Sequence, residues 1–506
     1  MRPALLLVLP ALIPAGPALA LTPEALVATW RTQAAEWGTP FEVEVEEQED
    51  GSLLVRNVAP PPPDAADFMP VGSPLREAVL VPMADGTVEI RGGMGERFDL
   101  PLDPAGLALR IEQTNARMLA RDGADEPGID YAYSADVVRI VLLPPPDRAH
   151  EASETEFALE LSDVAAQVPA RAAPEGNMAF DLEVSAAGLA YVMSSSDPVM
   201  GRTGGWARVE SPTLGVSATV PASAMAFFGG LSGREPNPAE LGQVLGAAFA
   251  DGMEMRFDLA SGGSTSASSA EGGVLSYSLE LSGGPGRTTY AVDRAGLLLS
   301  GSGEGMSVTA SAADLPFDPL EVRFGPMELE FRLPLFAAAP EPFRLRAALE
   351  DVTVGDAAWD ALDPGRVLPR EPMRFVYDLG GRMALNLDGL MEAQATGRPV
   401  PPPQVESLEL RELELSALGA LASGSGAVTF NASMLPTGSG VLTLTGIDRL
   451  LDAAVTLGLA TPRDLVPLRF GLASYFDAGE GEDVITSRID IAGRAVTMNG
   501  VPLPVE

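Results

Sequence analysis

Carboxylates dominate the side chains of this sequence that could do chemistry. The chain contains 70 Asp and Glu, a single His and no Cys, and all of its 33 basic residues are Arg. A pair of carboxylates is the catalytic machinery of most glycoside hydrolases. Enzymes of that kind usually carry aromatic platforms for sugars, and this chain has only 4 Trp and 7 Tyr. A carboxylate-based hydrolase is therefore the third of the functions that we consider.

Other catalytic chemistries lack their residues. His150 lies in the proline-rich segment PPPDRAHE, and without Cys or a second His it cannot build a thiolate or multi-histidine metal site. The absence of Lys excludes Schiff-base chemistry and the phosphate-binding lysine of a P-loop. No Gly-x-Ser-x-Gly elbow accompanies the single His. We therefore predict that the protein is not an enzyme and has no catalytic residues and no cofactor.

One cluster of acids stands out, in the segment RDGADEPGID. It brings Asp122, Asp125, Glu126 and Asp130 close together in the sequence. Carboxylate oxygens of this kind bind calcium, but the spacing matches no known calcium loop. A solvated acidic turn is the interpretation that we favour, so no metal site is predicted.

The N-terminus and the charge balance restrict location and partners. Residues 1–20, MRPALLLVLPALIPAGPALA, have one Arg, an apolar run and small residues at Ala18 and Ala20, which are typical of a secretory signal peptide. The run is broken by prolines and shorter than the roughly 20 apolar residues of a membrane helix. We predict cleavage after Ala20 and a periplasmic mature chain without a transmembrane segment. The net charge of −37 repels phosphate backbones, so we expect no nucleic-acid partner.

Strands are predicted by a two-residue alternation of apolar and polar side chains. In FGPMELEFRLPLF the apolar residues Met327, Leu329 and Phe331 alternate with charged ones. FEVEVEEQEDGSLLVRNV reads as a hairpin that turns at EDG, and EAVLVPMADGTVEIRGG as another that turns at Asp85-Gly86. The abundant Gly and Pro, 53 and 45 residues, separate many such runs. The predicted fold is mainly β (α+β): a long twisted antiparallel sheet, partly closed or trough-like, with a few covering helices.

Four helices are predicted from their start signals. One follows the cleavage site, with Thr22 as N-cap and Pro23 at the first position, and another begins at Asn237 and Pro238. GIDRLLDAAVTLGL and TPRDLVPLRFGLASYFD predict two more near the C-terminus. In the last of them we expect Pro467 to kink or delay the helix. Most of these helices should cover the sheet.

Irregularities in the pattern predict bends. LELRELEL changes phase between Leu410 and Leu413, which predicts a β-bulge at Arg411-Glu412. Gly380-Gly381 predicts a tight reversal after the strand PMRFVYDL. SGGSTSASSAEGG fits either a flexible linker or a thin strand, and EAQATGRPVPPPQ is the better linker candidate because prolines cannot join a central ladder.

The predicted organisation is a signal peptide (1–20), an N-terminal helix with a strand-rich region (21–350), and a C-terminal β region with two helices (351–506) that continues the same sheet. Similar strand starts at Met178, Met253 and Met327, about 75 residues apart, fit either true repeats or a shared strand vocabulary.

The segment AAWDALDPGRVLPREPMRFVYDLGG resembles a family of exported alphaproteobacterial proteins known only as a domain of unknown function. The closing stretches VESLELRELELSALGALASGSGAVTF and DVITSRIDIAGRAVTMNGVPL support the resemblance, which is clearest over the last third of the chain. The resemblance implies no catalytic residue. In its general residue pattern rather than in a defined motif, TGSGVLTLTGIDRLL also resembles AsmA-like envelope proteins. This resemblance implies a curled sheet with an apolar groove.

These observations lead to two main functional hypotheses. The first is a periplasmic, non-enzymatic envelope protein that binds lipid or another apolar ligand on a curved sheet. The alternative is a periplasmic protein-interaction scaffold in which the apolar face is packed as core. The possible partners are thus a lipid or an envelope protein, and the sequence names no ligand-binding residue.

Overall fold

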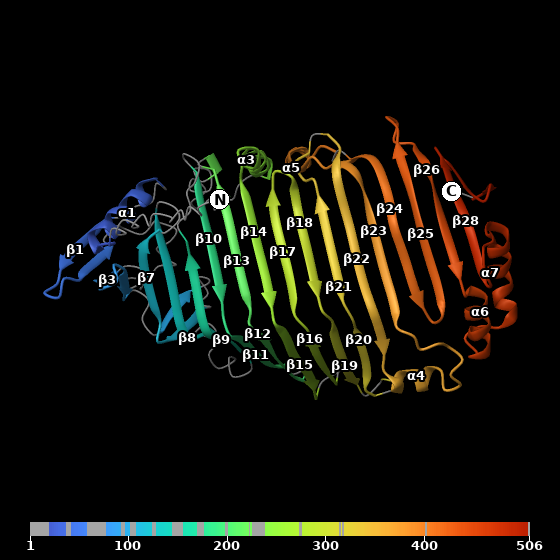
Figure 1. Cartoon of the computed structure of the whole chain (residues 1–506), viewed down its shortest axis with the longest axis horizontal. Coiled ribbons are helices and arrows are strands. Elements are labelled where there is room, and N and C mark those ends of the chain that lie inside the picture. Colours follow the sequence, from blue (N-terminus) through green and yellow to red (C-terminus); the bar gives the residue numbers. More distant parts are fainter. Residues whose placement is uncertain are drawn as a thin grey trace, which may run out of the picture.

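A computed structural model shows a long sheet of strands that lie side by side from the N-terminal to the C-terminal end (Figure 1). It describes residues 20–503 except 37–41, 58–76, 93–96, 102–107, 124–127, 144–154, 170–176, 198–200, 222, 225–237, 273–275, 313–314, 316–317, 338 and 400–401. The 30 strands of the described part form one sheet, and every pairing in it is antiparallel.

The N-terminal third consists of one helix and short strands that lead into two long ones. Its elements are α1 (Pro23–Glu36), β1 (Val43–Glu47), β2 (Leu53–Asn57), β3 (Glu77–Pro82), β4 (Val88–Arg91), β5 (Arg97–Pro101), β6 (Ala108–Thr114), β7 (Arg117–Asp122), β8 (Ile129–Leu143) and β9 (Thr155–Val168).

The middle of the sheet is built from strands that are each divided into two halves. The upper halves in Figure 1 are β10 (Met178–Ser185), β13 (Thr213–Val220), β14 (Glu254–Ser261), β17 (Gly286–Asp293), β18 (Gly296–Gly303) and β21 (Met327–Leu333). The lower halves are β11 (Gly188–Asp197), β12 (Gly201–Glu210), β15 (Gly263–Glu271), β16 (Tyr277–Gly283), β19 (Met306–Ala312) and β20 (Leu320–Phe324).

The C-terminal part has long unbroken strands and most of the helices. Its strands are β22 (Glu341–Val354), β23 (Met373–Ala384), β24 (Gln404–Ala417), β25 (Ala420–Phe430), β26 (Pro436–Thr445), β27 (Asp477–Ala478), β28 (Val484–Ala492), β29 (Ala495–Met498) and β30 (Val501–Pro502). The helices after α1 are α3 (Pro238–Ala250), α4 (Asp356–Leu362), α5 (Leu387–Thr396), α6 (Ile447–Thr456) and α7 (Pro462–Tyr475).

A line of breaks crosses the middle of the sheet. The two halves of a divided strand follow on from each other: β9 pairs with both β10 and β11 at one end of the line, and β22 with both β21 and β20 at the other. The breaks fall at residues that interrupt a ladder, among them Ser211–Pro212, Gly284–Pro285 and Gly325–Pro326. Ser211 has a positive φ of 44°, and proline has no N–H to donate to a neighbouring strand.

Apolar and polar side chains lie on opposite faces of this sheet. One row of cross-strand neighbours in the upper half consists of Leu182, Val216, Phe257, Tyr290, Leu299, Phe331, Leu345, Leu379 and Leu410. We call the face that carries this row the apolar face and the opposite one the polar face. In β22, where the register can be followed across the break line, Leu349 pairs with Phe375 and Val352 with Met373. The extra residue between Leu349 and Val352 therefore keeps the apolar face continuous.

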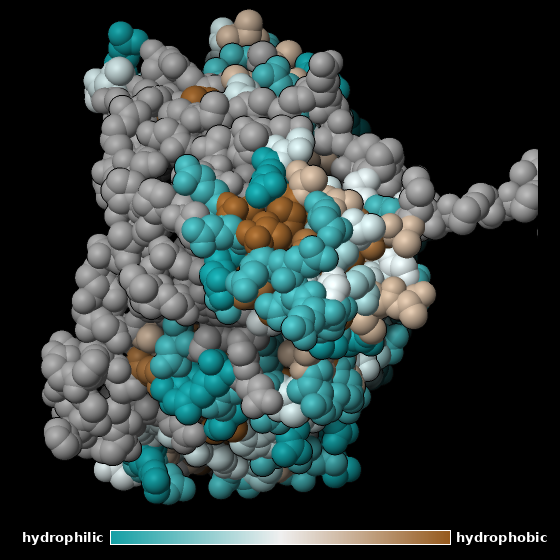
Figure 2. Space-filling model, turned by 90° about the vertical axis from the view of Figure 1, so that its left-hand side faces the viewer, coloured by the Kyte–Doolittle hydropathy of each residue, from teal (hydrophilic) through white to brown (hydrophobic). Residues whose placement is uncertain are grey.

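Helix α1 covers the N-terminal end of the apolar face. Leu26 and Val27 are buried against Leu53, Leu80 and Val88 of the short strands, and the Trp30 indole N–H donates a hydrogen bond of 2.9 Å to the Tyr131 hydroxyl. Figure 2 views the molecule from this end, where a small hydrophobic patch is surrounded by hydrophilic residues.

Helices α3 and α5 cover the upper edge of the apolar face (Figure 1). The Phe249 and Phe336 rings stack with centroids 4.5 Å apart, and the cluster around Phe249 packs on Met255 and Val292. Further along the apolar face, three large apolar residues remain partly exposed to solvent: Phe257 is 37%, Tyr290 44% and Leu329 46% exposed. The helices thus cover the N-terminal end and the upper edge of the apolar face, while side chains in its middle meet solvent.

The structure confirms most of the elements expected from the sequence. The sheet, the strand that begins at Met327, both early hairpins and the four helices are present, and SGGSTSASSAEGG contains strand β15. The register of β24 shifts between Leu410 and Leu413, which confirms the predicted bulge. Strand β22 runs across position 350, so the sheet is continuous there.

Three local expectations were wrong in whole or in part. Gly380-Gly381 makes no reversal, because β23 runs on to Ala384; a Cβ at Gly381 would collide with the carbonyl oxygen of Ser407, so the glycine allows a close strand approach instead. Pro467 was expected to kink or delay the last helix, and the delay is wrong, because α7 begins at Pro462 and continues through Pro467 to Tyr475. EAQATGRPVPPPQ is not a linker throughout, since EAQAT forms the second half of α5.

Some predictions concern residues outside the described ranges. They include the signal peptide up to residue 19, His150, and the N-cap Asn237.

Candidate functional site

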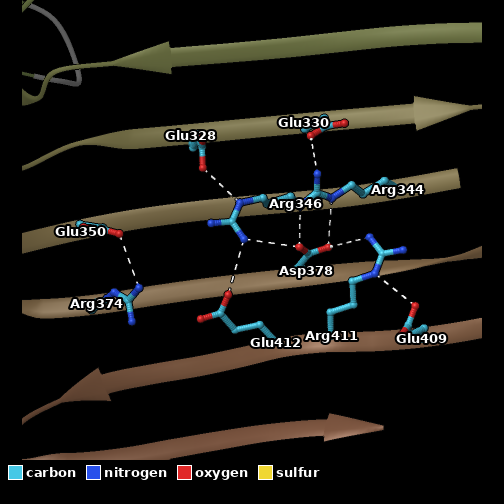
Figure 3. Close-up of polar contacts among 10 residues, drawn as sticks. All are labelled: Glu328, Glu330, Arg344, Arg346, Glu350, Arg374, Asp378, Glu409, Arg411 and Glu412. Carbon is cyan, nitrogen blue, oxygen red and sulfur yellow. Dashed lines mark hydrogen bonds and ion pairs between the residues drawn. The ribbon is translucent and has the colours of Figure 1, made fainter. Parts of the chain in front are cut away.

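The polar face carries a network of ion pairs centred on Asp378 of β23 (Figure 3). Arg344 donates to both carboxylate oxygens of Asp378, at 3.2 Å from Nε and 2.7 Å from Nη2. Arg346 reaches the same carboxylate at 3.4 Å. The Asp378 side chain is only 7% exposed, so the arginines replace the water that would otherwise solvate it.

The network extends over β21, β22, β23 and β24. Arg344 also donates to Glu330 at 3.0 Å, and Arg346 to Glu328 at 3.1 Å. These pairs link residues that are direct or diagonal neighbours across the strands. Opposite charges in these positions stabilise strand pairing and register.

The bulge in β24 supplies the third arginine. Asp378 pairs with Glu412 and Leu379 with Leu410, so Arg411 is the extra residue. Its Nη1 lies 3.8 Å from Asp378 Oδ1. A Cβ at Gly380 would lie 2.8 Å from Arg411 Nη2, which means that the glycine leaves room for this side chain. The bulge could be predicted from the sequence. That it brings Arg411 close to Asp378 could not, because this depends on the register of β23 and β24.

The arrangement favours the ionised form of the Asp378 carboxylate. The hydrogen bonds from Arg344 lower the pKa of Asp378 below its usual range, and the charges of Arg411 and Arg346 add to the effect. An ionised carboxylate accepts hydrogen bonds but has no proton to give. The network therefore suits a structural role in the sheet better than acid catalysis.

A pH dependence of stability follows from the lowered pKa. A group whose pKa is lower in the folded state stabilises that state above its unfolded pKa and loses the contribution as the pH falls through the folded value. We expect the contribution of Asp378 to be constant from about pH 7 to about pH 5, to decrease below the ordinary pKa of 3.8, and to be lost as the pH falls through the lowered pKa of the folded state. Thermal melts of wild type and Asp378→Asn should converge at low pH; convergence already near neutrality would contradict this assignment.

The segment before β23 forms a compact loop that leads into this network. The Asp363 carboxylate is fully buried and accepts hydrogen bonds from the backbone N–H groups of Val367 and Leu368, at 2.9 and 2.8 Å. Arg370 lies over the Trp359 ring at 5.7 Å and pairs with Asp360 at 2.8 Å. The motif that carries the family resemblance thus has a structural role, because these contacts fix the segment that leads into β23.

The apolar face contains a distinct concavity near the C-terminal end, which we call the apolar trough. It has a volume of about 310 Å³, and its lining comprises Leu379, Leu408, Leu410, Leu413, Gly424, Ser425, Gly426, Ala427, Val428, Ser439, Gly440, Val441, Leu442, Ile489 and Ile491. No charged residue is among them. This volume is at the lower end of the range of small-molecule sites.

Glycines form the floor of the apolar trough. Gly426 of β25 and Gly440 of β26 are cross-strand neighbours, and a Cβ on Gly426 would lie 2.7 Å from the Gly440 Cα. Leu410 and Leu413 stand on one side, and Ile489 of β28 on the other. The floor is therefore bare backbone between aliphatic walls, which leaves a channel where side chains would otherwise fill the space.

The polar face has a larger groove beside the line of breaks. It encloses about 760 Å³ and is lined by, among others, Arg287, Ser302, Glu304, Glu328 and Glu350. Glu328 also belongs to the ion-pair network through Arg346. Charged and polar side chains therefore alternate with apolar residues such as Pro326 and Ala348 in its lining, and the groove lies on the opposite face from the apolar trough.

The sequence-based candidates for metal binding gain no support. Asp130 pairs with Arg121 at 3.2 Å, and Asp125 and Glu126 lie outside the described residues. Within the described ranges no group of three or more His, Asp or Glu could hold a metal ion.

None of the helices in the described part of the chain has the length and hydrophobicity needed to cross a bilayer.

Fold and surface together define an elongated single-sheet β protein with one largely polar face and one partly open apolar face. The chain belongs to a family of uncharacterised proteins conserved in bacteria, DUF2125, whose pattern covers residues 247–505. That match includes the ion-pair network and the apolar trough and reaches further than the last third expected from the sequence. No curated protein and no solved structure shows significant similarity to the chain.

Proposed function

We propose that the protein is an exported, periplasmic envelope protein that binds lipid through its apolar face, with one hydrocarbon chain in the apolar trough. The observation that carries this proposal is the trough itself, a concavity with an aliphatic lining on a face that is open to solvent. A polar ligand would lose its hydration there without gaining hydrogen bonds from side chains. A hydrocarbon chain loses nothing by leaving water, and each buried methylene contributes about 0.8 kcal/mol.

The exposed row outside the trough supports a ligand longer than the trough. Phe257, Tyr290 and Leu329 are 37%, 44% and 46% exposed, and the register connects their strands to β24 through an unbroken series of apolar neighbours. Further alkyl chains bound along this row would cover surface that is otherwise unfavourable in water.

The periplasmic location is supported by the N-terminal region. The segment up to Ala20 has the composition of a signal peptide. Leu21, the first residue after the expected cleavage site, is 5% exposed, and its backbone N donates to the Gly86 carbonyl oxygen at 3.1 Å. Cleavage after Ala20 would leave this buried anchor in place.

A protein-interaction scaffold is the second candidate, and the same exposed aromatic residues favour it. Phe257 and Tyr290 are of the type that is enriched in protein interfaces. On this alternative a partner protein, rather than lipid, covers the apolar face. A hydrolase remains a sequence-based prediction for which no pair of carboxylates in the described residues offers a specific argument.

The test is native mass spectrometry of the protein exported with its own N-terminal segment and purified gently from the periplasm, followed by lipid extraction. We expect phospholipid or free fatty acid to remain bound at a fixed stoichiometry. A clean mass for the protein alone, in a sample to which lipid was added back without effect, would overturn the proposal. A co-purifying protein at fixed stoichiometry would establish the scaffold.

A further inference from the structure

Helix α7 carries apolar side chains on the side that points away from the rest of the molecule. Val466 is 61% and Phe470 is 74% exposed, and because they are four residues apart they lie on one side of the helix. Leu459, just before the helix, is 78% exposed. These are among the largest exposures of apolar side chains in the described chain.

The packing of α7 on the protein does not need these residues. Its inner side contains Leu465, which is buried. Arg469 ties it to α6 through Asp448 at 3.3 Å and Asp452 at 2.6 Å. The N-terminus is fixed by reciprocal hydrogen bonds between Thr461 and Asp464. A helix that is apolar on its anchored side and on its outer side normally has a second apolar neighbour.

The size of this patch argues against a protein as that neighbour. A stable protein interface buries about 800 Å² on each partner, more than the outer surface of Leu459, Val466 and Phe470 can supply. A lipid surface needs less, since a few apolar anchors that enter the headgroup region suffice for peripheral binding.

The local charge also fits a lipid surface. The segment 447–475 contains three Asp and three Arg and is neutral, whereas the whole chain has a net charge of −37. Arg463 is exposed and, three residues before Val466, shares its side of the helix. It can pair with a lipid phosphate while the apolar side chains enter the interface.

We propose that the C-terminal end of the protein docks on a phospholipid membrane through the outer side of α7. Helix α7 is connected to the sheet that forms the apolar trough, because it is followed by β27, which pairs with β28, the strand that supplies Ile489. Docking is nevertheless independent of lipid binding in the trough, and either can hold without the other.

The absence of Cys permits a site-specific test in the full chain. Phe470→Cys would be labelled with an environment-sensitive fluorophore and mixed with phosphatidylcholine vesicles. The matched control is Leu362→Cys at the end of α4, a position that is 62% exposed but belongs to a different helix. We expect a several-fold rise in fluorescence at position 470 and little change at position 362, because only the former enters an apolar environment.

A substitution next to the probe provides the second readout. Val466→Glu should lower vesicle binding, measured by flotation, by about tenfold or more, since the burial of a Val side chain is lost. It should leave lipid co-purification and the circular dichroism spectrum unchanged. Equal responses of the two probes, or vesicle flotation unaffected by Val466→Glu, would overturn the proposal. So would a concentration-dependent dimer that Val466→Glu dissolves, because the neighbour of α7 would then be a second copy of the chain.

Discussion

Asp378→Ala is expected to destabilise the sheet around β22, β23 and β24 by about 2–3 kcal/mol. The substitution leaves Arg344, Arg346 and Arg411 facing one another without the carboxylate that they share. Removing one partner of a buried ion pair costs about 3–5 kcal/mol. The arginine side chains here are 34%, 24% and 43% exposed, so water moderates the loss.

Amide hydrogen exchange measured by mass spectrometry can localise this effect. Peptides that cover 341–354, 373–384 and 404–417 should exchange roughly 30- to 150-fold faster in Asp378→Ala, while peptides from β11 and β12 serve as an internal reference. Glu409→Gln is the matched control: Glu409 pairs with Arg411 at 3.2 Å, but both side chains are about half exposed, so the change should stay within about 0.5 kcal/mol. Similar exchange in both variants would mean that the network does not hold these strands together.

The architecture could be predicted from the sequence, because strands of a sheet with one apolar and one polar face show a direct alternation of apolar and polar residues. Met327, Leu329 and Phe331 lie on the apolar face as their spacing predicts. The bulge at Arg411 was equally visible, since an extra residue shifts the phase of the pattern. The same signal marks the line of breaks, where apolar Phe324 is followed by apolar Met327 across Gly325–Pro326, but a single strand cannot show that its neighbours break at the same level.

The candidate site was not accessible in the same way, because it depends on pairing between distant segments. GSG occurs at 424–426 and again at 438–440, and neither occurrence alone shows which residue lies opposite it. The register places Gly426 opposite Gly440, and only this pairing makes the two motifs the floor of the apolar trough. Gly380-Gly381 shows the same limit: a pair of glycines that suggests a turn instead allows Arg411 and the neighbouring backbone to come close.

Filling the apolar trough should abolish ligand binding there without unfolding the protein. Ile489→Trp places a larger apolar side chain on the wall opposite Leu410 and Leu413, so it displaces a hydrocarbon chain and keeps the surface apolar. If three or four methylene contacts are lost, at about 0.8 kcal/mol each, affinity for a long-chain fatty acid should fall by roughly 50- to 200-fold. Isothermal titration calorimetry with palmitate, with lipid extraction of the same preparations, would measure the change.

Leu329→Trp is the matched control for this variant. It makes a similar enlargement on the same face but outside the trough, at a side chain that is already 46% exposed. If it preserves fatty-acid affinity while Ile489→Trp removes it, the trough is the binding site and the exposed row is secondary. If Leu329→Trp weakens binding and Ile489→Trp does not, the ligand lies along the open face. The glycine floor would then be explained by close strand approach alone, because a side chain at Gly426 or Gly440 would meet the neighbouring backbone at 2.7–2.9 Å even without a ligand.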